Sequence, residues 1–259
     1  MSFAHLPDRV AEVRERVAQA VARGGRGQRV TIVAVTKTHG PDAIMATWNA
    51  GLRDIGENKV QEAVGKMADV SVPIAWHLIG HLQRNKVKWL DRFAVLHSLD
   101  SVRLADAVCE YGMARGRAVD ALVQVNVAGE GTKGGYAPED LPAEAERLTR
   151  LAGVRVCGVM VMAPFDADEP TLRRVFAGAR SARELLVGAG HPAFELSQLE
   201  KSRRAYLGQL RAMIERQMAE LDATESAPLR SPEPPRTEEY DDPRAKKKTP
   251  AWLDSLIKE

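Results

Sequence analysis

Val30-Thr-Ile-Val-Ala-Val-Thr-Lys37 is the stretch of sequence that decides the fold class. Its near-continuous run of β-branched residues is typical of a strand buried on both faces of a parallel sheet. Gly40 and Pro41 follow at once and predict the start of a helix, because proline is tolerated at the first helical position, where the amide has no partner. Gly51, which can adopt a positive φ, is expected to end that helix. The stretch therefore predicts a buried strand followed by a helix.

The same alternation of apolar runs and amphipathic stretches continues to residue 197. Helices are expected at 101–115, 137–152 and 170–188. Strands joined by connections of helix length run parallel. We therefore expect an α/β fold, best fitted by a (β/α) barrel of the TIM type that is incomplete, because the sequence shows no eighth strand. After the first strand, further strands are expected at 53–56, 75–80, 94–98, 121–127, 154–163 and 193–197.

The composition argues against several classes of protein. The 259 residues include 37 Lys and Arg against 35 Asp and Glu, a net charge of +2, which argues against a nucleic-acid partner. No stretch approaches the ~20 apolar residues of a membrane span, and the N-terminus lacks the apolar core of a signal peptide. Cys109 and Cys157 form no motif and are interpreted as free buried thiols in a reducing compartment. We expect a cytoplasmic protein without a membrane span.

The last quarter of the chain, after Ser197, has a different character. Residues 198–222 have the composition of one long helix, which either packs on its own domain or forms a short coiled coil. Residues 223–259 hold six of the chain's 14 prolines together with runs of like charge, so we expect them to be disordered. The tip of this tail is either a partner-binding peptide or a frayed end. The apolar stripe of the helix consists of Leu207, Leu210, Ile214, Met218 and Leu221.

Polar residues follow several of the expected strands, where parallel α/β folds place their chemistry. Lys37 is the most informative of them, because its side chain would start inside the barrel. Burial lowers the pKa of a lysine, and the neutral amine can form a Schiff base with an aldehyde. The alternative is a lysine that extends to the rim and pairs with a carboxylate such as Glu57. Position by itself leaves both interpretations open.

A metal site is the other chemistry considered at these strand ends. His77 and His81 are four residues apart, a spacing that places two ligands on one face of a helix. Here the pair spans the end of a strand and a loop, and no nearby carboxylate completes a zinc site. We therefore expect no metal.

Three motifs in this region resemble the pyridoxal-phosphate homeostasis protein family, known as the YggS group. They are Ala34-Val-Thr-Lys-Thr38, Ile55-Gly-Glu-Asn-Lys-Val-Gln-Glu62 and Trp76-His-Leu-Ile-Gly-His-Leu-Gln-Arg-Asn-Lys86. The resemblance covers residues 1–197 and implies that Lys37 forms a Schiff base with pyridoxal 5′-phosphate (PLP). It further implies that PLP is bound by Asn58, His81, Met160 and Ser197. Shorter matches follow in the same order at His97-Ser-Leu-Asp-Ser101, Gln124-Val-Asn126 and Gly158-Val-Met160.

The family is similar to the N-terminal barrel of alanine racemase but lacks its second, β-rich domain. That domain supplies the acid/base group that racemisation needs on the opposite face of the cofactor. The resemblance therefore implies a protein that binds PLP and contributes to its intracellular homeostasis, without an established turnover. A PLP-dependent, racemase-like enzyme is kept as an alternative.

The resemblance ends at Ser197, where the family continues into a phosphate-binding loop, a helix and an eighth strand. Here Gln198 begins the charged helix instead, so we expect weaker phosphate binding and unpaired strand edges. Within that helix, residues 204–217 weakly resemble the C-terminal coiled coil of DivIVA-type cell-division proteins. This leaves a further alternative, in which the barrel has lost its cofactor and residues 198–259 mediate self-association or bind a protein partner.

Overall fold

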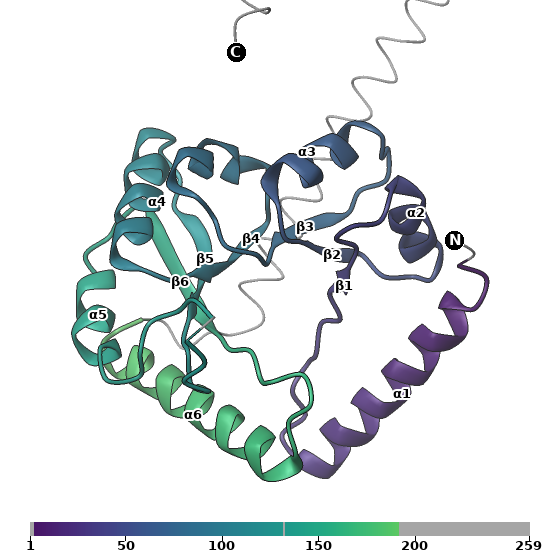
Figure 1. Ribbon diagram of the computed structural model, residues 1–259. Helices are drawn as coiled ribbons and strands as arrows, with labels where there is room; N and C mark the ends of the chain where they lie inside the picture. Colours follow the sequence, from purple (N-terminus) through teal and green to yellow (C-terminus); the bar gives the residue numbers. More distant parts are fainter. Residues whose placement is uncertain (1–2, 132, 192–259) are drawn as a thin grey trace, which may run out of the picture. The chain divides into compact units, whose positions relative to one another are not determined.

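Residues 3–131 and 133–191 are described by the computed structural model of the chain, and they form an α/β fold built on six parallel strands (Figure 1). The strands follow one another across the sheet in chain order, from β1 at one edge to β6 at the other. Each is followed by a helix or a long loop, which returns the chain so that the next strand runs in the same direction. The strands are β1 (Ala34–Val35), β2 (Asp54–Glu57), β3 (Ala75–Leu78), β4 (Val95–Leu99), β5 (Val119–Gln124) and β6 (Val154–Met160).

The helices lie along the outside of this sheet (Figure 1). Pro41 begins α2 and Asp168 caps α6, its side chain accepting a hydrogen bond of 2.9 Å from the Thr171 amide. Three helical elements, α1, α3 and η1, lie outside the stretches that the sequence patterns indicated. The helices are α1 (Leu6–Gly24), α2 (Pro41–Asn49), α3 (Val60–Ala68), the 3-10 helix η1 (Arg84–Arg92), α4 (Val102–Ala114), α5 (Leu141–Leu148) and α6 (Glu169–Gly188).

The hydrophobic core fills the layer between the sheet and the helices. Ile55 of β2 lies in register with Trp76 of β3, and both belong to one cluster with Ile44 of α2 and Ala63 of α3. Side chains alternate between the two faces of a strand, so Gly56 and its register partner His77 lie on the opposite, inner face. Glu57 returns to the helix side, where it is fully buried.

The first strand is shorter than the sequence predicts. Only Ala34 and Val35 pair with β2, whereas Val30 is 50% exposed and precedes the ladder. β1 is an edge strand within the described sheet and pairs with β2 alone. No second strand of that sheet supplies hydrogen bonds that would lengthen it. The run of Val and Ile correctly indicated the strand, but the ladder decided its length.

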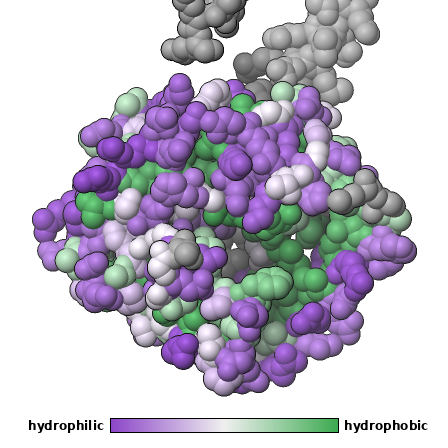
Figure 2. All heavy atoms as spheres, viewed as in Figure 1, coloured by the Kyte–Doolittle hydropathy of each residue, from purple (hydrophilic) through white to green (hydrophobic). Residues whose placement is uncertain are grey.

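The inner face of the sheet is only partly covered at β1. Val35 is 51% exposed. Its register partner Gly56 has little free space, because a Cβ added there would lie 3.0 Å from the Ile79 side chain and 3.4 Å from the Val33 side chain. In the space-filling view, hydrophobic residues gather toward the middle of the molecule, where the surface is hollowed, and hydrophilic residues surround them (Figure 2). The described residues thus contain six parallel strands of the expected barrel.

Several expectations fall on residues outside the described ranges. The seventh strand at 193–197, the helix at 198–222, the tail at 223–259 and Ser197 all lie there, so barrel closure and the domain boundaries remain predictions. Among the helices that the structure describes, none is long and apolar enough to cross a membrane. Cys109 and Cys157 are buried and form no disulfide, as expected.

Two glycines bring α4 against the loop before β6. A Cβ added to Gly112 would overlap the backbone carbonyl of Gly153, and one added to Gly153 would overlap that of Cys109. Because the obstacles are backbone atoms, side-chain rotation cannot relieve the overlap. The absence of a side chain at Gly112 therefore lets α4 approach the loop at Gly153 closely, and any side chain there would push the two apart.

We predict that Gly112→Ala lowers the free energy of unfolding by about 2–3 kcal/mol, the cost of overpacking, despite the better helix propensity of alanine. Gly65→Ala in α3 is the matched control, because an added Cβ there meets nothing within 4 Å. The control should gain about 0.5–1 kcal/mol. Urea denaturation of the three proteins measures both changes, and equal stability of Gly112→Ala and the wild type would contradict the packing argument.

Candidate functional site

The carboxyl ends of β1 to β4 bring four of the candidate polar residues to the same edge of the sheet. Lys37 follows β1, Asn58 follows β2, His81 follows β3, and Asp100 follows β4. The loops after β2 and β3 are in close contact, because a Cβ added to Gly80 would overlap the backbone of Asn58. The edge therefore joins an amine, an amide, an imidazole and a carboxylate.

Lys37 is exposed, which corrects the expectation that it is desolvated inside the sheet. Only two residues of β1 are in the ladder, and a turn begins at Lys37 instead of a continuing strand. No residue among those described forms a hydrogen bond or an ion pair with the Lys37 side chain. The alternative in which Lys37 pairs with Glu57 is also wrong, because Glu57 Oε1 pairs with Lys66 and the buried Glu57 Oε2 has no hydrogen-bond partner in the described part of the chain.

Glu57 is at the centre of a buried polar cluster beside Lys37. Its Oε1 accepts a hydrogen bond of 2.6 Å from the Thr36 hydroxyl and one of 2.7 Å from Lys66 Nζ. Lys66 also donates to the Thr36 carbonyl at 2.9 Å and to Glu62 Oε1 at 2.7 Å. Glu62 Oε1 in turn accepts a bond of 2.6 Å from the Thr38 amide. The cluster therefore contacts the residue on each side of Lys37.

The charges in this cluster stabilise one another. Burial by itself lowers the pKa of Lys66, but its hydrogen bonds with Glu57 and Glu62 outweigh that effect, and the net pKa is raised above the ordinary value. The hydrogen bond from Lys66 is the largest cause that lowers the pKa of Glu62, and the Thr38 amide adds to it. Lys66 is thus a buried cation that keeps its proton.

The sequence motifs did not single out Lys66 as a functional residue, and Glu62 entered only as the last position of one motif. The two residues are four apart and lie on α3, so their side chains meet on one helix face. A Glu and a Lys at this spacing directly after a strand end were the available signal. What the sequence does not show is that this pair reaches back to β1, which lies 30 residues away at Thr36.

His81 is held by Asp100. His81 Nδ1 lies 2.6 Å from Asp100 Oδ2, and the Ser101 hydroxyl donates to Asp100 Oδ1 at 3.1 Å. The carboxylate is an acceptor, so Nδ1 carries the proton and Nε2 is left as an acceptor in the neutral ring. Asp100 is buried while the His81 side chain is 69% exposed. The dyad presents an oriented imidazole at the strand ends.

The other predicted site residues occupy different positions. Asn58 is half-buried, and its side-chain amide makes no hydrogen bond with another described residue. Met160 ends β6, is half-buried, and its carbonyl accepts a bond of 2.9 Å from the Val125 amide. The ladder from β1 to β6 thus places Met160 and Lys37 at the ends of opposite edge strands. Ser197 lies outside the described residues.

His77 and His81 have separate partners. His77 Nδ1 lies 2.9 Å from His97 Nε2, and His77 Nε2 lies 3.3 Å from Asp54 Oδ1. His77 and His97 belong to adjacent strands, and their rings meet edge to face with centroids 5.1 Å apart. Burial lowers the pKa of His97 to about 3, and the neighbouring His77 adds to the effect. His97 is therefore held neutral within the sheet.

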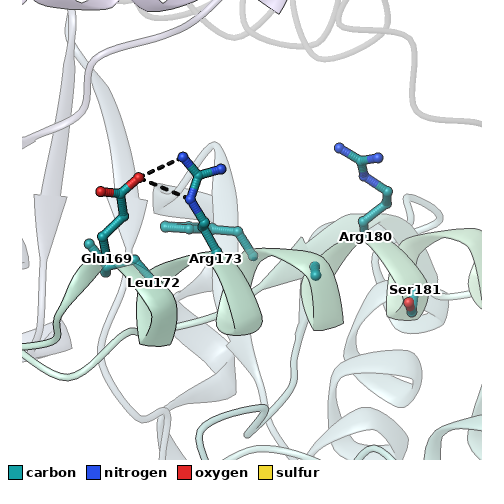
Figure 3. Close-up of a pocket in the computed structure, with 7 residues that line it drawn as sticks. Glu169, Leu172, Arg173, Arg180 and Ser181 are labelled. Atoms are coloured by element: carbon teal, nitrogen blue, oxygen red, sulfur yellow. Dashed lines mark hydrogen bonds and ion pairs between the residues drawn. The ribbon is translucent and has the colours of Figure 1, made fainter.

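A separate pocket lies along α6 (Figure 3). The described residues that line it recur along one face of the helix from Glu169 to Ser181, and Arg173 donates to Glu169 in two hydrogen bonds. The face includes Phe176, which is 59% exposed, and it lies opposite the face that buries Val175 and Ala182. Of the predicted site residues, the four that the structure describes, Lys37, Asn58, His81 and Met160, do not line this pocket.

The sequence and the fold match a known class of protein. The chain matches the family model described as alanine racemase, N-terminal domain, over residues 9–216, a range that extends past Ser197. The alanine racemase of Corynebacterium glutamicum has the same fold, with a TM-score of 0.53 at 15% identity over 63% of this chain and 47% of that one. The class is therefore the barrel domain of the alanine racemases.

Closer relatives define the branch of this class. The pyridoxal phosphate homeostasis protein of Pseudomonas aeruginosa is 38% identical over 187 residues, which are 70% of this chain and 79% of that protein. The protein of the same description from Deinococcus radiodurans is 41% identical over 183 residues, 70% of this chain and 84% of that protein. The chain belongs to the pyridoxal phosphate homeostasis proteins.

Solved structures support the same assignment. The structure of PipY from Synechococcus elongatus PCC7942 with PLP bound is similar to this chain, with a TM-score of 0.59 at 34% identity. The similarity covers 70% of this chain and 84% of that one. An unknown protein from Bifidobacterium adolescentis has a TM-score of 0.67 at 32% identity, over 74% of this chain and 83% of that chain.

The neutral state of His97 predicts a pH dependence of stability. The unfolded chain takes up a proton near pH 6.5, whereas the folded chain does so only near pH 3. Between these values the unfolded state binds more protons, so stability falls as the pH is lowered through this window and is independent of this group above it. The slope contributed by His97 approaches about 1.4 kcal/mol per pH unit.

Urea denaturation between pH 5 and 7 measures this slope, and His97→Gln should reduce it because glutamine does not titrate. His39→Gln is the control, since His39 lies in the turn after β1 and away from the buried pair. Equal slopes for His97→Gln and the wild type would show that His97 titrates normally in the folded chain.

Proposed function

We propose that this protein binds PLP at the carboxyl edge of β1 to β4 and contributes to PLP homeostasis, with Lys37 as the residue that forms the Schiff base. The observation that carries the proposal is the unpartnered, exposed amine of Lys37 at the end of β1, next to an Asn58 amide that is also free of described partners. The relatives described as pyridoxal phosphate homeostasis proteins and the PLP bound to PipY indicate the ligand.

The donor set fits the aldehyde end of this cofactor. Lys37, once deprotonated, would supply the amine that condenses with the aldehyde, the C=N bond replacing the C=O bond with release of one water. An amine already bound in an ion pair would first have to give up that partner, whereas Lys37 has none among the described residues. PLP supplies an electron sink when bound, and the protein supplies position and orientation.

Three further residues are proposed to surround the cofactor. The Asn58 amide would donate to or accept from a polar atom of PLP, and the His81 ring, fixed by Asp100, would offer Nε2. Met160 would give an apolar contact. The proposed phosphate side includes Ser197 and lies beyond residue 191, so the described residues support the aldehyde end of the site.

The proposal is binding and buffering of the cofactor in the cytoplasm, without a turnover reaction. Free PLP reacts with amines of many kinds, and a protein that holds it reversibly on one lysine limits that reaction. The formation of the imine is reversible by addition of water, which makes one lysine sufficient for storage and release. No additional acid/base group is needed for this role.

Lys37→Ala should abolish the reducible imine. We expect the wild-type protein mixed with PLP to show the imine absorbance band, and borohydride to fix the adduct on the peptide that contains Lys37. Lys59→Ala is the matched control, because Lys59 is also exposed and lies next to Asn58. Visible spectra and peptide mass spectrometry measure the result. A band of equal size in Lys37→Ala would assign the imine to another lysine.

Asn58→Ala should weaken PLP binding by about tenfold, which corresponds to the loss of one hydrogen bond to the ligand. The control is Asn85→Ala in η1, an exposed asparagine outside the site. Titration of each variant with PLP, followed by the imine absorbance, gives the two affinities. If both variants bind as tightly as the wild type, Asn58 does not contact the cofactor.

A further inference from the structure

We propose that Glu62 and Lys66 are positioning residues, which fix the backbone on both sides of Lys37 and so direct its amine into the site. The inference rests on the proposed function, because the amine is positioned for PLP. It concerns residues of α3 that make no contact with the Lys37 side chain itself.

The residue before Lys37 is anchored twice. Lys66 Nζ donates to the Thr36 carbonyl at 2.9 Å, and the Thr36 hydroxyl donates to Glu57 Oε1 at 2.6 Å. Thr36 is 4% exposed, so neither bond competes with bulk water. The Thr36 amide also donates to the Gly56 carbonyl at 3.1 Å, a bond of the last β1–β2 ladder pair, Val35 with Gly56. Thr36 therefore has fixed backbone and side-chain positions.

The residue after Lys37 is anchored by Glu62. The Thr38 amide donates to Glu62 Oε1 at 2.6 Å, and the same oxygen accepts from Lys66. The Lys66 ammonium group is thereby connected to both neighbours of Lys37. It bonds Thr36 directly, and it is connected to Thr38 through Glu62. The Lys37 backbone therefore lies between two fixed residues, Thr36 and Thr38, and Lys66 takes part in holding both.

The backbone at Thr38 indicates that this arrangement is under strain. Thr38 has a φ of 66°, and it is the one non-glycine residue with a positive φ in the part of the chain that the structure describes. A β-branched residue has a steric cost in this conformation, so surrounding contacts must hold it. The bond from the Thr38 amide to Glu62 is such a contact. It holds the turn that begins at Lys37.

The two lysines of this region have opposite properties. The ammonium group of Lys66 donates to three acceptors, in Thr36, Glu57 and Glu62, and its side chain is 7% exposed. Lys37 is exposed and has no described partner. Of the two, Lys37 can therefore offer a free amine to an aldehyde, and Lys66 holds it in place as a cation.

The test compares Glu62→Ala with Glu62→Gln and Asp106→Ala. Glu62→Ala removes the anchor of Thr38 but leaves Lys66 paired with Glu57, so the buried charge stays compensated and the variant can fold. Glu62→Gln restores an oxygen that accepts the Thr38 amide. Asp106→Ala is the structural control, because Asp106 forms a comparable ion pair with Arg147 between α4 and α5.

The first readout uses PLP-free protein. Hydrogen exchange of the Thr38 amide should be about tenfold faster or more in Glu62→Ala, because a hydrogen bond to a charged group is lost. It should be close to the wild-type rate in Glu62→Gln and unchanged in Asp106→Ala. An unchanged rate in Glu62→Ala would overturn the proposal.

The second readout is borohydride trapping of PLP on Lys37 at a fixed, subsaturating concentration. We expect at least about fivefold less trapped adduct in Glu62→Ala, recovery in Glu62→Gln, and wild-type trapping in Asp106→Ala. Faster exchange with undiminished trapping would overturn the positioning role and leave the proposed function standing. Absence of trapping in the wild-type chain would instead overturn the proposed function, and with it the role of the anchors toward PLP.

Discussion

The ammonium group of Lys66 is the contact on which the candidate site depends. It is buried, and its three hydrogen bonds go to Thr36 directly after β1, to Glu57 of β2 and to Glu62 of α3. A buried cation is tolerated only when its charge and its donors are matched, and here Glu57 and Glu62 supply both. The strand end that carries Lys37 is thus fixed by α3, a helix that follows the next strand.

This constraint explains why the edge strand can be so short. β1 has only two residues in the ladder, and an edge strand of that length has few backbone bonds to hold its end. The side-chain bonds of Thr36 and the amide bond of Thr38 replace the missing ladder. The chain can then leave the sheet at Lys37, which makes the amine accessible instead of buried within the sheet.

The sequence predicted the class of fold and the family for identifiable reasons. The β-branched run at 30–37 and the helix-length connections indicated parallel strands, and six strands lie near their expected positions. The motif around Lys37 indicated the family, which the relatives confirm. Prediction failed where long-range contacts decide the outcome: the exposure of Lys37, the true partner of Glu57 and the length of β1 each depend on residues distant in the chain.

By itself, the sequence determined that the strands are parallel and that Lys37, Asn58 and His81 lie at their carboxyl ends, because local hydrophobic pattern and chain direction suffice for both. Only the tertiary structure decided that Glu57 binds Lys66 and not Lys37, and that Asp100 orients His81. Such pairings depend on which elements become neighbours when the sheet forms. Hydrophobic patterning specifies the faces that pack together, whereas the partner of each buried charge is fixed only by the packed geometry.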